Sequence, residues 1–271
     1  MSTLRQRALT AFYENLAHVQ QDIDYYLNPI GLSRRETIVS LVTARAGETV
    51  IDLGCGDGLI AVKLQEGDRR VLGCDLSWTR ARRARQSGIA ALCADVLALP
   101  YRGESFDWAI CSEVIEHVTD PRLAMTEIWR VLRPGGAAIL TVPLDEHLEQ
   151  TLLDVPEETL ASGQYQEIKA HFDLKGSHLS CFTAESFRHL VRVSGFAIEA
   201  TAYTYNHTLT RPLLWRAAKR LYRALAGRRP TAPFSRWVES LVRPLIALSY
   251  RREDSPHHIV VRARKARAVA C

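Results

Sequence analysis

Three glycines and an acidic residue make up the segment best suited to holding a ligand. The apolar run 50–53 has the character of a buried strand and contains Asp52. Glycines then recur at every second position: Gly54, Gly56 and Gly58. Glycine adopts positive φ and lets a ligand approach the backbone. Residues 59–65 have helical spacing, and a helix N-terminus there offers free N–H groups to an anion. The pattern predicts a strand, a glycine turn and a helix around a nucleotide-type cofactor.

Two other nucleotide-binding patterns fit less well. A dinucleotide fingerprint requires its third small residue at position 59, which is Leu59 in this chain. A P-loop ends in Gly-Lys-Ser or Gly-Lys-Thr, and neither sequence follows the glycines.

Further acids stand at the ends of the next predicted strands. Asp75 follows the apolar run 71–74 and lies 21 residues after Gly54, the place from which a carboxylate reaches ribose hydroxyls. Asp95 ends the next element, 90–95. More strands are predicted over 106–111 and 137–142, the second one after a Pro-Gly-Gly turn. This alternation of strands and helices predicts an α/β fold with a doubly wound sheet.

The segment beginning with Asp52, of the form D-x-G-x-G-x-G, resembles motif I of the class I S-adenosylmethionine-dependent methyltransferases. Between about residues 48 and 196 the chain is similar to the small-molecule group that includes the ubiquinone-biosynthesis O-methyltransferases. Two further matches are Arg133-Pro134-Gly135-Gly136 and the segment 182–187 followed by Gly195-Phe196. The resemblance implies a Rossmann-like sheet of seven mostly parallel strands and S-adenosyl-L-methionine as the cofactor.

The resemblance also assigns cofactor contacts. It places the methionine end on the glycine turn, the ribose on Asp75 and the adenine on Asp95. The full set of expected cofactor residues is Asp52, Gly54, Cys55, Gly56, Gly58, Asp75, Leu76, Asp95, Val96 and Ser112.

The acceptor side is expected around Glu113, Glu116 and His117, directly after the fourth strand. Positions i, i+3 and i+4 share one helical face, so these side chains can converge. In ubiquinone O-methyltransferases a matching Glu-x-x-Glu-His binds a divalent metal, and this donor set suits magnesium, manganese or zinc. The same pattern also occurs in methyltransferases without a metal requirement, where His117 is a candidate general base.

Two variable segments are expected to line the acceptor pocket. The stretch 144–180 leaves the carboxyl edge of the sheet, where open α/β sheets bind ligands, and is predicted to be a substrate lid. Its histidines His171 and His178 are further candidates for proton transfer. A helix predicted over residues 4–27, ended by Asn28-Pro29, either packs on the core or covers the cofactor.

A basic segment separates the last two predicted strands, 197–204 and 257–262. From Arg211 to Arg252 it has eleven Lys or Arg and one acid, Glu239. The first of its two amphipathic stretches has an apolar face made by Leu214, Ala217, Ala218, Leu221 and Leu225. The second has its face at Phe234, Trp237, Val238, Leu241, Val242, Leu245 and Leu248, with Pro244 bending the helix. A basic apolar hairpin suits an anionic membrane surface. Packing on the core or in a homodimer is the alternative, and nucleic-acid binding is disfavoured because no base-reading module is recognisable.

The domain organisation follows from these elements. Residues 1–46 are predicted to form a helical cap, 47–205 with 256–266 the methyltransferase core, and 206–255 the basic helical insertion before the last strand. Six cysteines without a C-x-x-C pair indicate reduced thiols and a cytoplasmic location, on or near the inner face of a membrane. No apolar run reaches the length of a spanning helix.

The predicted activity is methyl transfer to a small, lipophilic acceptor, with an oxygen atom as the expected methylation site. Metal-free transfer to carbon or nitrogen of a lipid, glycan or natural product is the second enzymatic hypothesis. An inactive methyltransferase fold that acts as an adaptor is the non-enzymatic one. The segment Cys111-Ser112-Glu113-Val114 differs from the Asn-Pro-Pro-Tyr type and so argues against methylation of nucleic-acid bases.

Overall fold

The computed structural model describes residues 3–19, 29–65, 68–144, 178–226 and 236–266. Within them, one seven-stranded sheet has the order β3-β2-β1-β4-β5-β7-β6. Its strands are β1 (Thr49–Leu53), β2 (Arg70–Asp75), β3 (Ala90–Cys93), β4 (Phe106–Ser112), β5 (Leu132–Pro143), β6 (Phe196–Leu209) and β7 (Tyr250–Lys265). The first five strands are parallel, and β7 runs antiparallel between β5 and β6. The predicted α/β fold is confirmed.

Helices cover both faces of this sheet. The helices of the described residues are α1 (Thr3–Val19), α3 (Pro29–Leu41), α4 (Leu59–Gln65), α5 (Trp78–Gln86), the 3-10 turn η1 (Ile115–His117), α6 (Pro121–Val131), α9 (Ala184–Val193), α10 (Pro212–Ala226) and α11 (Arg236–Ser249). One apolar core lies between the sheet and α6 and α9, and the other between the sheet and α3, α4 and α5. Because both faces are covered, β4 and β5 are buried almost continuously along their length.

Side chains at the helix starts explain where several helices begin. Ser77 accepts a hydrogen bond from the N–H of Arg80, and Asp120 accepts one from Leu123 before Pro121 opens α6. Thr183 and Ser186 form a reciprocal capping box at α9. These caps fix the helices that return the chain to the next strand.

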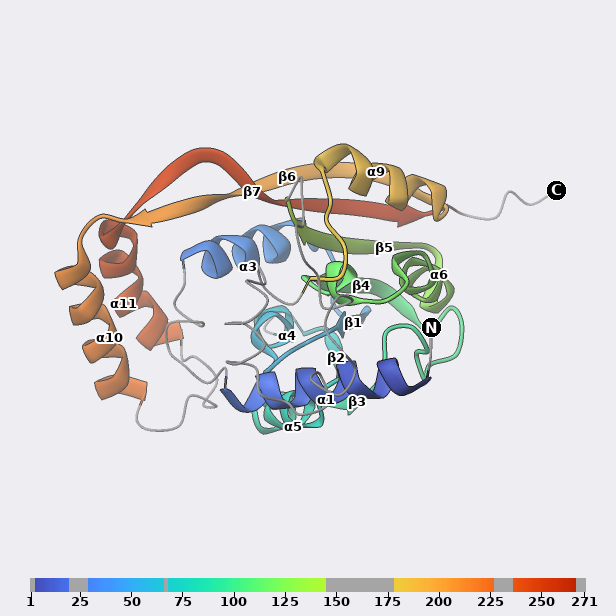
Figure 1. Cartoon of the computed structure of the whole chain (residues 1–271), viewed down its shortest axis with the longest axis horizontal. Helices are drawn as coiled ribbons and strands as arrows, with labels where there is room; N and C mark the ends of the chain where they lie inside the picture. The colour runs from blue at the N-terminus through green and yellow to red at the C-terminus, as the bar shows by residue number, and fades with distance from the viewer. Residues whose placement is uncertain (1–2, 20–28, 66–67, 145–177, 227–235, 267–271) are drawn as a thin grey trace.

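The helix predicted over 4–27 is described as α1 up to Val19, and the rest of that prediction, from residue 20 to 28, lies outside the described residues. Pro29, which was predicted to end that helix, is the first residue of α3. Proline is accepted at the first helical position because its missing N–H would be unpaired there. α1 lies along α5, while α3 lies between the sheet and the α10–α11 pair (Figure 1).

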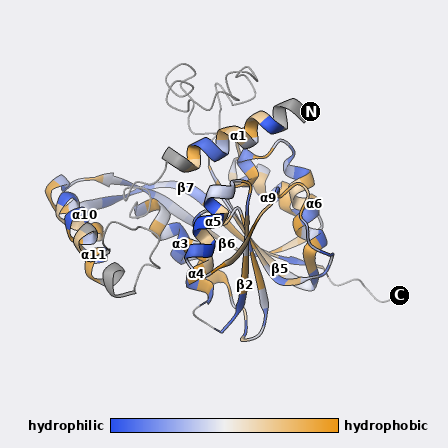
Figure 2. Cartoon of the chain, turned by 90° about the horizontal axis from the view of Figure 1, so that it is seen from below, coloured by the Kyte–Doolittle hydropathy of each residue, from blue (hydrophilic) through white to orange (hydrophobic). Residues whose placement is uncertain are grey.

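The Arg133-Pro134-Gly135-Gly136 segment lies inside the bounds of β5 rather than before them. Pairing shifts from Phe106 opposite Leu132 to Trp108 opposite Ala137, so the predicted turn is an irregular stretch of the strand. β6 and β7 also extend beyond their predicted ends. They form a long antiparallel ribbon with α10 and α11 at its far end (Figures 1 and 2).

The buried contact of the α10–α11 hairpin includes Ala218 and Val242 of the predicted apolar faces, with Leu245 packed against it. Its packed residues are Trp215, Ala218, Tyr222, Val242 and Ile246, together with Leu32 of α3. Leu221, Leu241 and Leu248 of the predicted faces are exposed. Trp215 and Tyr222, which were not part of the predicted faces, complete this contact. In the described part of the chain, no helix has the length and hydropathy required to cross a membrane.

Candidate functional site

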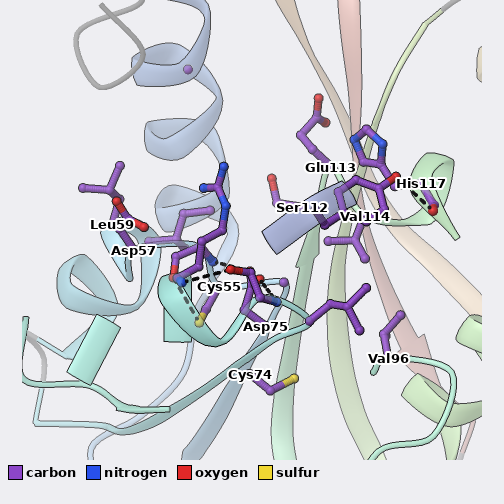
Figure 3. Close-up of a pocket in the computed structure, with 18 of the residues that line it drawn as sticks. Cys55, Asp57, Leu59, Cys74, Asp75, Val96, Ser112, Glu113, Val114 and His117 are labelled. Atoms are coloured by element: carbon purple, nitrogen blue, oxygen red, sulfur yellow. Dashed lines mark hydrogen bonds between the residues drawn. The ribbon is translucent and has the colours of Figure 1, made fainter. Parts of the chain in front are cut away.

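A cavity of about 500 Å³ opens at the carboxyl ends of β1, β2, β3 and β4. Its walls come from both sides of the molecule. One side is the glycine turn with Asp75 and Asp95, and the other includes Glu113, His117 and residues of α3 and β7. Figure 3 places Asp75 on the glycine-turn side, facing Glu113 and His117 across the opening. The cavity therefore joins the predicted cofactor side and the predicted acceptor side.

The glycine turn requires its glycines for two separate reasons. Gly54, Gly56 and Gly58 all have positive φ, at 71°, 54° and 88°. At Gly54 a Cβ would also lie 2.2 Å from Cγ2 of Val114, so the turn passes directly against the end of β4. The N–H groups of Gly54 and Cys55 both donate to the carbonyl of Cys74, which ties the turn to β2.

Asp75 organises the cofactor side. Its Oδ2 accepts the N–H of Gly56 at 2.9 Å and its Oδ1 accepts the N–H of Ser77 at 2.9 Å. Burial raises the pKa of Asp75 above its usual value, while Arg80 and these two N–H donors act in the opposite direction. The carboxylate is thus held at the tip of β2, where the sequence placed it (Figure 3).

Asp52 lies beneath the turn and is 1% exposed. Among the described residues, its Oδ2 has no hydrogen-bond partner. Burial, and then the charge of Asp75, raise the pKa of Asp52 to about 7. A cationic ligand in the cavity would favour the ionised form of this carboxyl.

Eight of the ten predicted cofactor residues line the cavity, namely Gly54, Cys55, Gly56, Asp75, Leu76, Asp95, Val96 and Ser112. Asp52 and Gly58 are not among the lining residues, and a Cβ added at Gly58 would lie 3.3 Å from Ala84 of α5. On the acceptor side Glu113, His117 and His178 line the cavity, while Glu116 is buried behind it. His171 and most of the predicted lid, 145–177, lie outside the described residues.

The acceptor side also contains residues that the sequence interpretation missed. Arg34 comes from α3, and His257 and His258 come from β7. The adjacent histidines were visible in the sequence only as the start of a strand. Since 145 residues separate His258 from Glu113, no local pattern could place them together. Tyr13 of α1 also lines the cavity.

Glu113 is held by three neighbours. Its Oε2 lies 3.1 Å from Nη1 of Arg34 and 2.8 Å from Nε2 of His258, and Oγ1 of Thr141 donates to its Oε1 at 2.8 Å. Although burial acts in the other direction, Arg34 and His258 bring the pKa of Glu113 down to about 2. Its backbone has φ of 57°, a region that non-glycine residues rarely adopt. Such a conformation persists only where the surroundings enforce it.

A second cluster consists of Glu116, His117 and His178. Nε2 of His117 lies 3.6 Å from Oε1 of Glu116, and the rings of His117 and His178 are 4.9 Å apart. Burial, followed by the charge of Glu113, raises the pKa of Glu116 well above its usual value. The side chain of Glu116 is 1% exposed, and neither of its oxygens has a hydrogen-bond partner among the described residues.

The predicted metal triad of Glu113, Glu116 and His117 is not brought together. Among the described residues, the candidate donor atoms that lie within 4.8 Å of one another belong to Glu116, His117 and His178. Glu113 is instead held by Arg34 and His258. The residues present thus fit a divalent ion only if His178 replaces Glu113 as the third ligand.

Comparison with known families gives a match to the part of the chain that contains the glycine turn, Asp75 and Asp95. Residues 51–140 match the family model described as a methyltransferase domain. The chain is 31% identical over 137 residues to a ubiquinone biosynthesis O-methyltransferase of Methylococcus capsulatus, covering 48% of this chain and 55% of that protein. The first curated relatives are matched over about a third to just over half of their own length.

Solved structures match most of the chain at low identity. A SAM-dependent methyltransferase of Thermotoga maritima superposes with a TM-score of 0.58 at 19% identity, covering 94% of this chain and 98% of that one. The [4+2]-cyclase SpnF superposes with a TM-score of 0.55 at 20% identity, covering 87% and 81%. A methyltransferase and a cyclase share this fold, so the reaction has to be argued from the site.

Proposed function

We propose that this chain, which contains a class I S-adenosylmethionine-dependent methyltransferase domain, transfers a methyl group from that cofactor to an oxygen atom of a small, lipophilic acceptor. The observation that supports this most is the continuous cavity between Asp75 and the Glu113–His117 wall. A methyl donor bound along the strand ends would direct its sulfonium toward the histidines.

Separate residues of the chain would bind the parts of the cofactor. The glycine turn lets the cofactor approach the backbone, and Asp75 and Asp95 offer carboxylates to its ribose and adenine. Asp52 and Asp75 supply negative charge near a cofactor that carries a positive sulfonium. The acceptor must be aligned with the S–CH3 bond, because the sulfonium already activates the methyl group.

Proton removal would fall to the cluster of Glu116, His117 and His178. When bound, the cofactor would supply a methyl group on a positive sulfur, and transfer of that methyl to the acceptor oxygen would leave the S–CH3 electron pair on sulfur, as neutral S-adenosylhomocysteine. The acceptor's hydroxyl proton is lost in the same reaction, and an imidazole at the cavity wall is suited to direct it to solvent. The tyrosyl OH of Tyr13 donates to the carbonyl of His117 at 3.4 Å and so helps position that residue.

Calorimetric titration tests the cofactor assignment. We expect micromolar binding of S-adenosylmethionine to the wild type and at least a tenfold weaker affinity for Asp75→Ala. A binding-competent protein is then supplied with quinol, phenol and lipid hydroxyl acceptors, and methyl transfer is followed by mass. Failure of the wild type to bind the cofactor would favour an adaptor role for the fold.

The lipophilic acceptor is supported by the α10–α11 hairpin. Leu213 is 76% exposed and Leu248 is 55% exposed, and both lie on helices that also present exposed arginines, including Arg216, Arg220 and Arg243. An apolar surface ringed by basic residues suits an anionic membrane interface. α3, which packs against this hairpin through Leu32, also contributes Arg34 to the cavity. We therefore include peripheral membrane association in the proposal, with its location at the cytoplasmic face.

Liposome sedimentation tests this association. The wild type should sediment with anionic vesicles at low salt, and a Leu213→Asp/Leu248→Asp variant should not. Leu123→Asp changes a comparably exposed leucine on α6 and is the matched control. Size-exclusion chromatography with light scattering tests the alternative that the hairpin packs against a second copy of the chain. In that case the wild type would be a dimer and the double variant a monomer.

Transfer to nitrogen or carbon remains the second candidate. The printed names of the similar proteins support keeping this alternative, because they include both ubiquinone biosynthesis O-methyltransferases and a possible histamine N-methyltransferase. Product analysis after incubation with mixed acceptors distinguishes the methylated atom by its mass fragments.

A further inference from the structure

We propose that Glu116, His117 and His178 form a divalent metal site, and that Glu113 is not one of its ligands. The role of the ion in proton removal rests on the proposed function, but its binding does not. The proposal starts from a cluster whose donor atoms lie within 4.8 Å of one another.

The carboxylate of Glu116 is the first reason. It is 1% exposed, and neither oxygen has a hydrogen-bond partner within the described ranges. A buried carboxylate without a hydrogen bond is strongly unfavourable in its ionised form. Its nearest recorded ionisable neighbour is His117, at 3.6 Å, a distance too long for a hydrogen bond. A cation between the three side chains would remove this cost.

The distribution of charge is the second reason. Glu113 is already balanced by Arg34 and His258, which lie 3.1 Å and 2.8 Å from its Oε2. A dipositive ion beside Glu116 would neutralise the charge of its carboxylate. The carboxylate of Glu113 already has Arg34 and His258 beside it.

The backbone around the cluster is the third reason. The segment that follows His178 is bound to Glu116 itself, because the N–H groups of Leu179 and Ser180 donate to its carbonyl at 2.7 and 3.1 Å. The N–H of His117 donates to the carbonyl of Val114 at 2.9 Å, and Tyr13 donates to the carbonyl of His117. Backbone hydrogen bonds therefore fix the two histidines relative to the carboxylate, as the outer contacts of a metal site commonly do.

Two imidazoles and one carboxylate select the kind of ion. Magnesium, calcium and manganese prefer oxygen ligands, while imidazole suits zinc, copper, iron and nickel. We therefore assign a borderline transition-metal ion, with open positions toward the cavity where His117 and His178 line it. Such an ion lowers the pKa of a hydroxyl that approaches it.

The test measures metal binding directly, without an acceptor. The full chain, stripped of metal, is titrated with Zn²⁺, Mn²⁺ or Mg²⁺ by calorimetry, and Co²⁺ binding is followed by its visible absorption. We expect one site that prefers the transition metals to Mg²⁺. Glu116→Gln and His178→Ala should each raise the Kd at least tenfold, while Glu113→Gln and His257→Ala should change it by less than threefold.

Several outcomes would overturn the proposal. Loss of binding in Glu113→Gln with retention in His178→Ala would return the ligand set to Glu113, Glu116 and His117. A wild type that binds S-adenosylmethionine but no transition metal at millimolar concentration would identify Glu116 as a buried acid, and would leave the proposed methyl transfer intact. Circular dichroism and cofactor binding verify that each variant is folded. A Zn²⁺-dependent rise in Tm should appear in the wild type and in Glu113→Gln but not in His178→Ala.

Discussion

The two sides of the cavity are built differently. The cofactor side comes from consecutive strand ends between residues 53 and 96, and its defining contacts are made by backbone groups, such as the N–H of Gly56 on Asp75. The acceptor side comes from α1, α3, the end of β4, residue 178 and β7, and its contacts are made by side chains far apart in sequence. One side is thus fixed by local chain geometry, and the other by long-range packing and charge pairing.

Gly54→Ala should produce the largest effect and should fall on the cofactor side. The new Cβ would meet Val114 at 2.2 Å and the residue would keep a φ of 71°. We expect S-adenosylmethionine affinity to fall by at least about 100-fold in calorimetric titration, a change of about 3 kcal/mol.

Gly88→Ala is the matched control for backbone strain. Gly88 has φ of 87° and lies outside the cavity, and a Cβ added there would meet nothing within 4 Å. The substitution should lower stability by about 1 kcal/mol and leave cofactor affinity unchanged. Equal cofactor affinities for the two variants would contradict the assignment of the turn as the cofactor-binding element.

Arg34→Ala should have the next largest effect and should act on the acceptor side. Removing the guanidinium leaves Glu113 with His258 and Thr141 as its partners. The side chains of Arg34 and Glu113 are each about one-fifth exposed. We expect the free energy of unfolding in urea to fall by about 2 kcal/mol, since one member of a largely buried pair is removed. Cofactor affinity should change by less than threefold.

A double-mutant cycle sharpens this prediction. Arg34→Ala/Glu113→Gln removes both charges and should cost less than the sum of the single variants. Arg133→Ala breaks an exposed pair with Asp107 and should cost under about 1 kcal/mol. Additive single-variant costs would mean that Arg34 and Glu113 do not act as a pair.

The same contrast explains how far the sequence could be interpreted. The glycines, Asp75 and Asp95 lie within one run of alternating strands and helices, so spacing and the family resemblance together located them, and the fold prediction was confirmed. Glu113 does not join Glu116 and His117 as the predicted triad required, because its partners, Arg34 and His258, come from α3 and β7 and left no local signal. The hairpin faces were predicted only in part, because helical periodicity identifies apolar stripes but not which of their residues meet α3.

The pH dependence of cofactor binding tests one charged group of the cofactor side, the carboxyl of Asp52. Since the pKa of Asp52 is raised to about 7, this carboxyl is protonated below that pH when no cofactor is bound. A cationic cofactor favours the carboxylate, so affinity should rise about tenfold between pH 6 and 8 and level off above that. For the cofactor-free protein the sign is opposite, because the stability from this raised pKa is present below pH 3.8 and is lost as pH rises through about 7.

Calorimetry in two buffers of different ionisation enthalpy measures the proton released on binding at pH 6. Asp52→Asn should abolish that release and flatten the pH profile. A wild-type affinity that does not vary between pH 6 and 8 would exclude Asp52 as the linked group.

The smallest expected effect concerns α1, which touches both sides. Tyr13 contacts His117 on the acceptor side, while Glu14 accepts hydrogen bonds from Ser77 and Thr79 at the start of α5. Glu14→Gln weakens that attachment but leaves Phe12 buried, so stopped-flow should record cofactor dissociation only about threefold faster, with Asn15→Ala unchanged. If the two sides are independent, the metal affinity of Glu14→Gln equals that of the wild type. If α1 couples them, the Kd for metal rises together with the cofactor dissociation rate, because the same helix then positions His117.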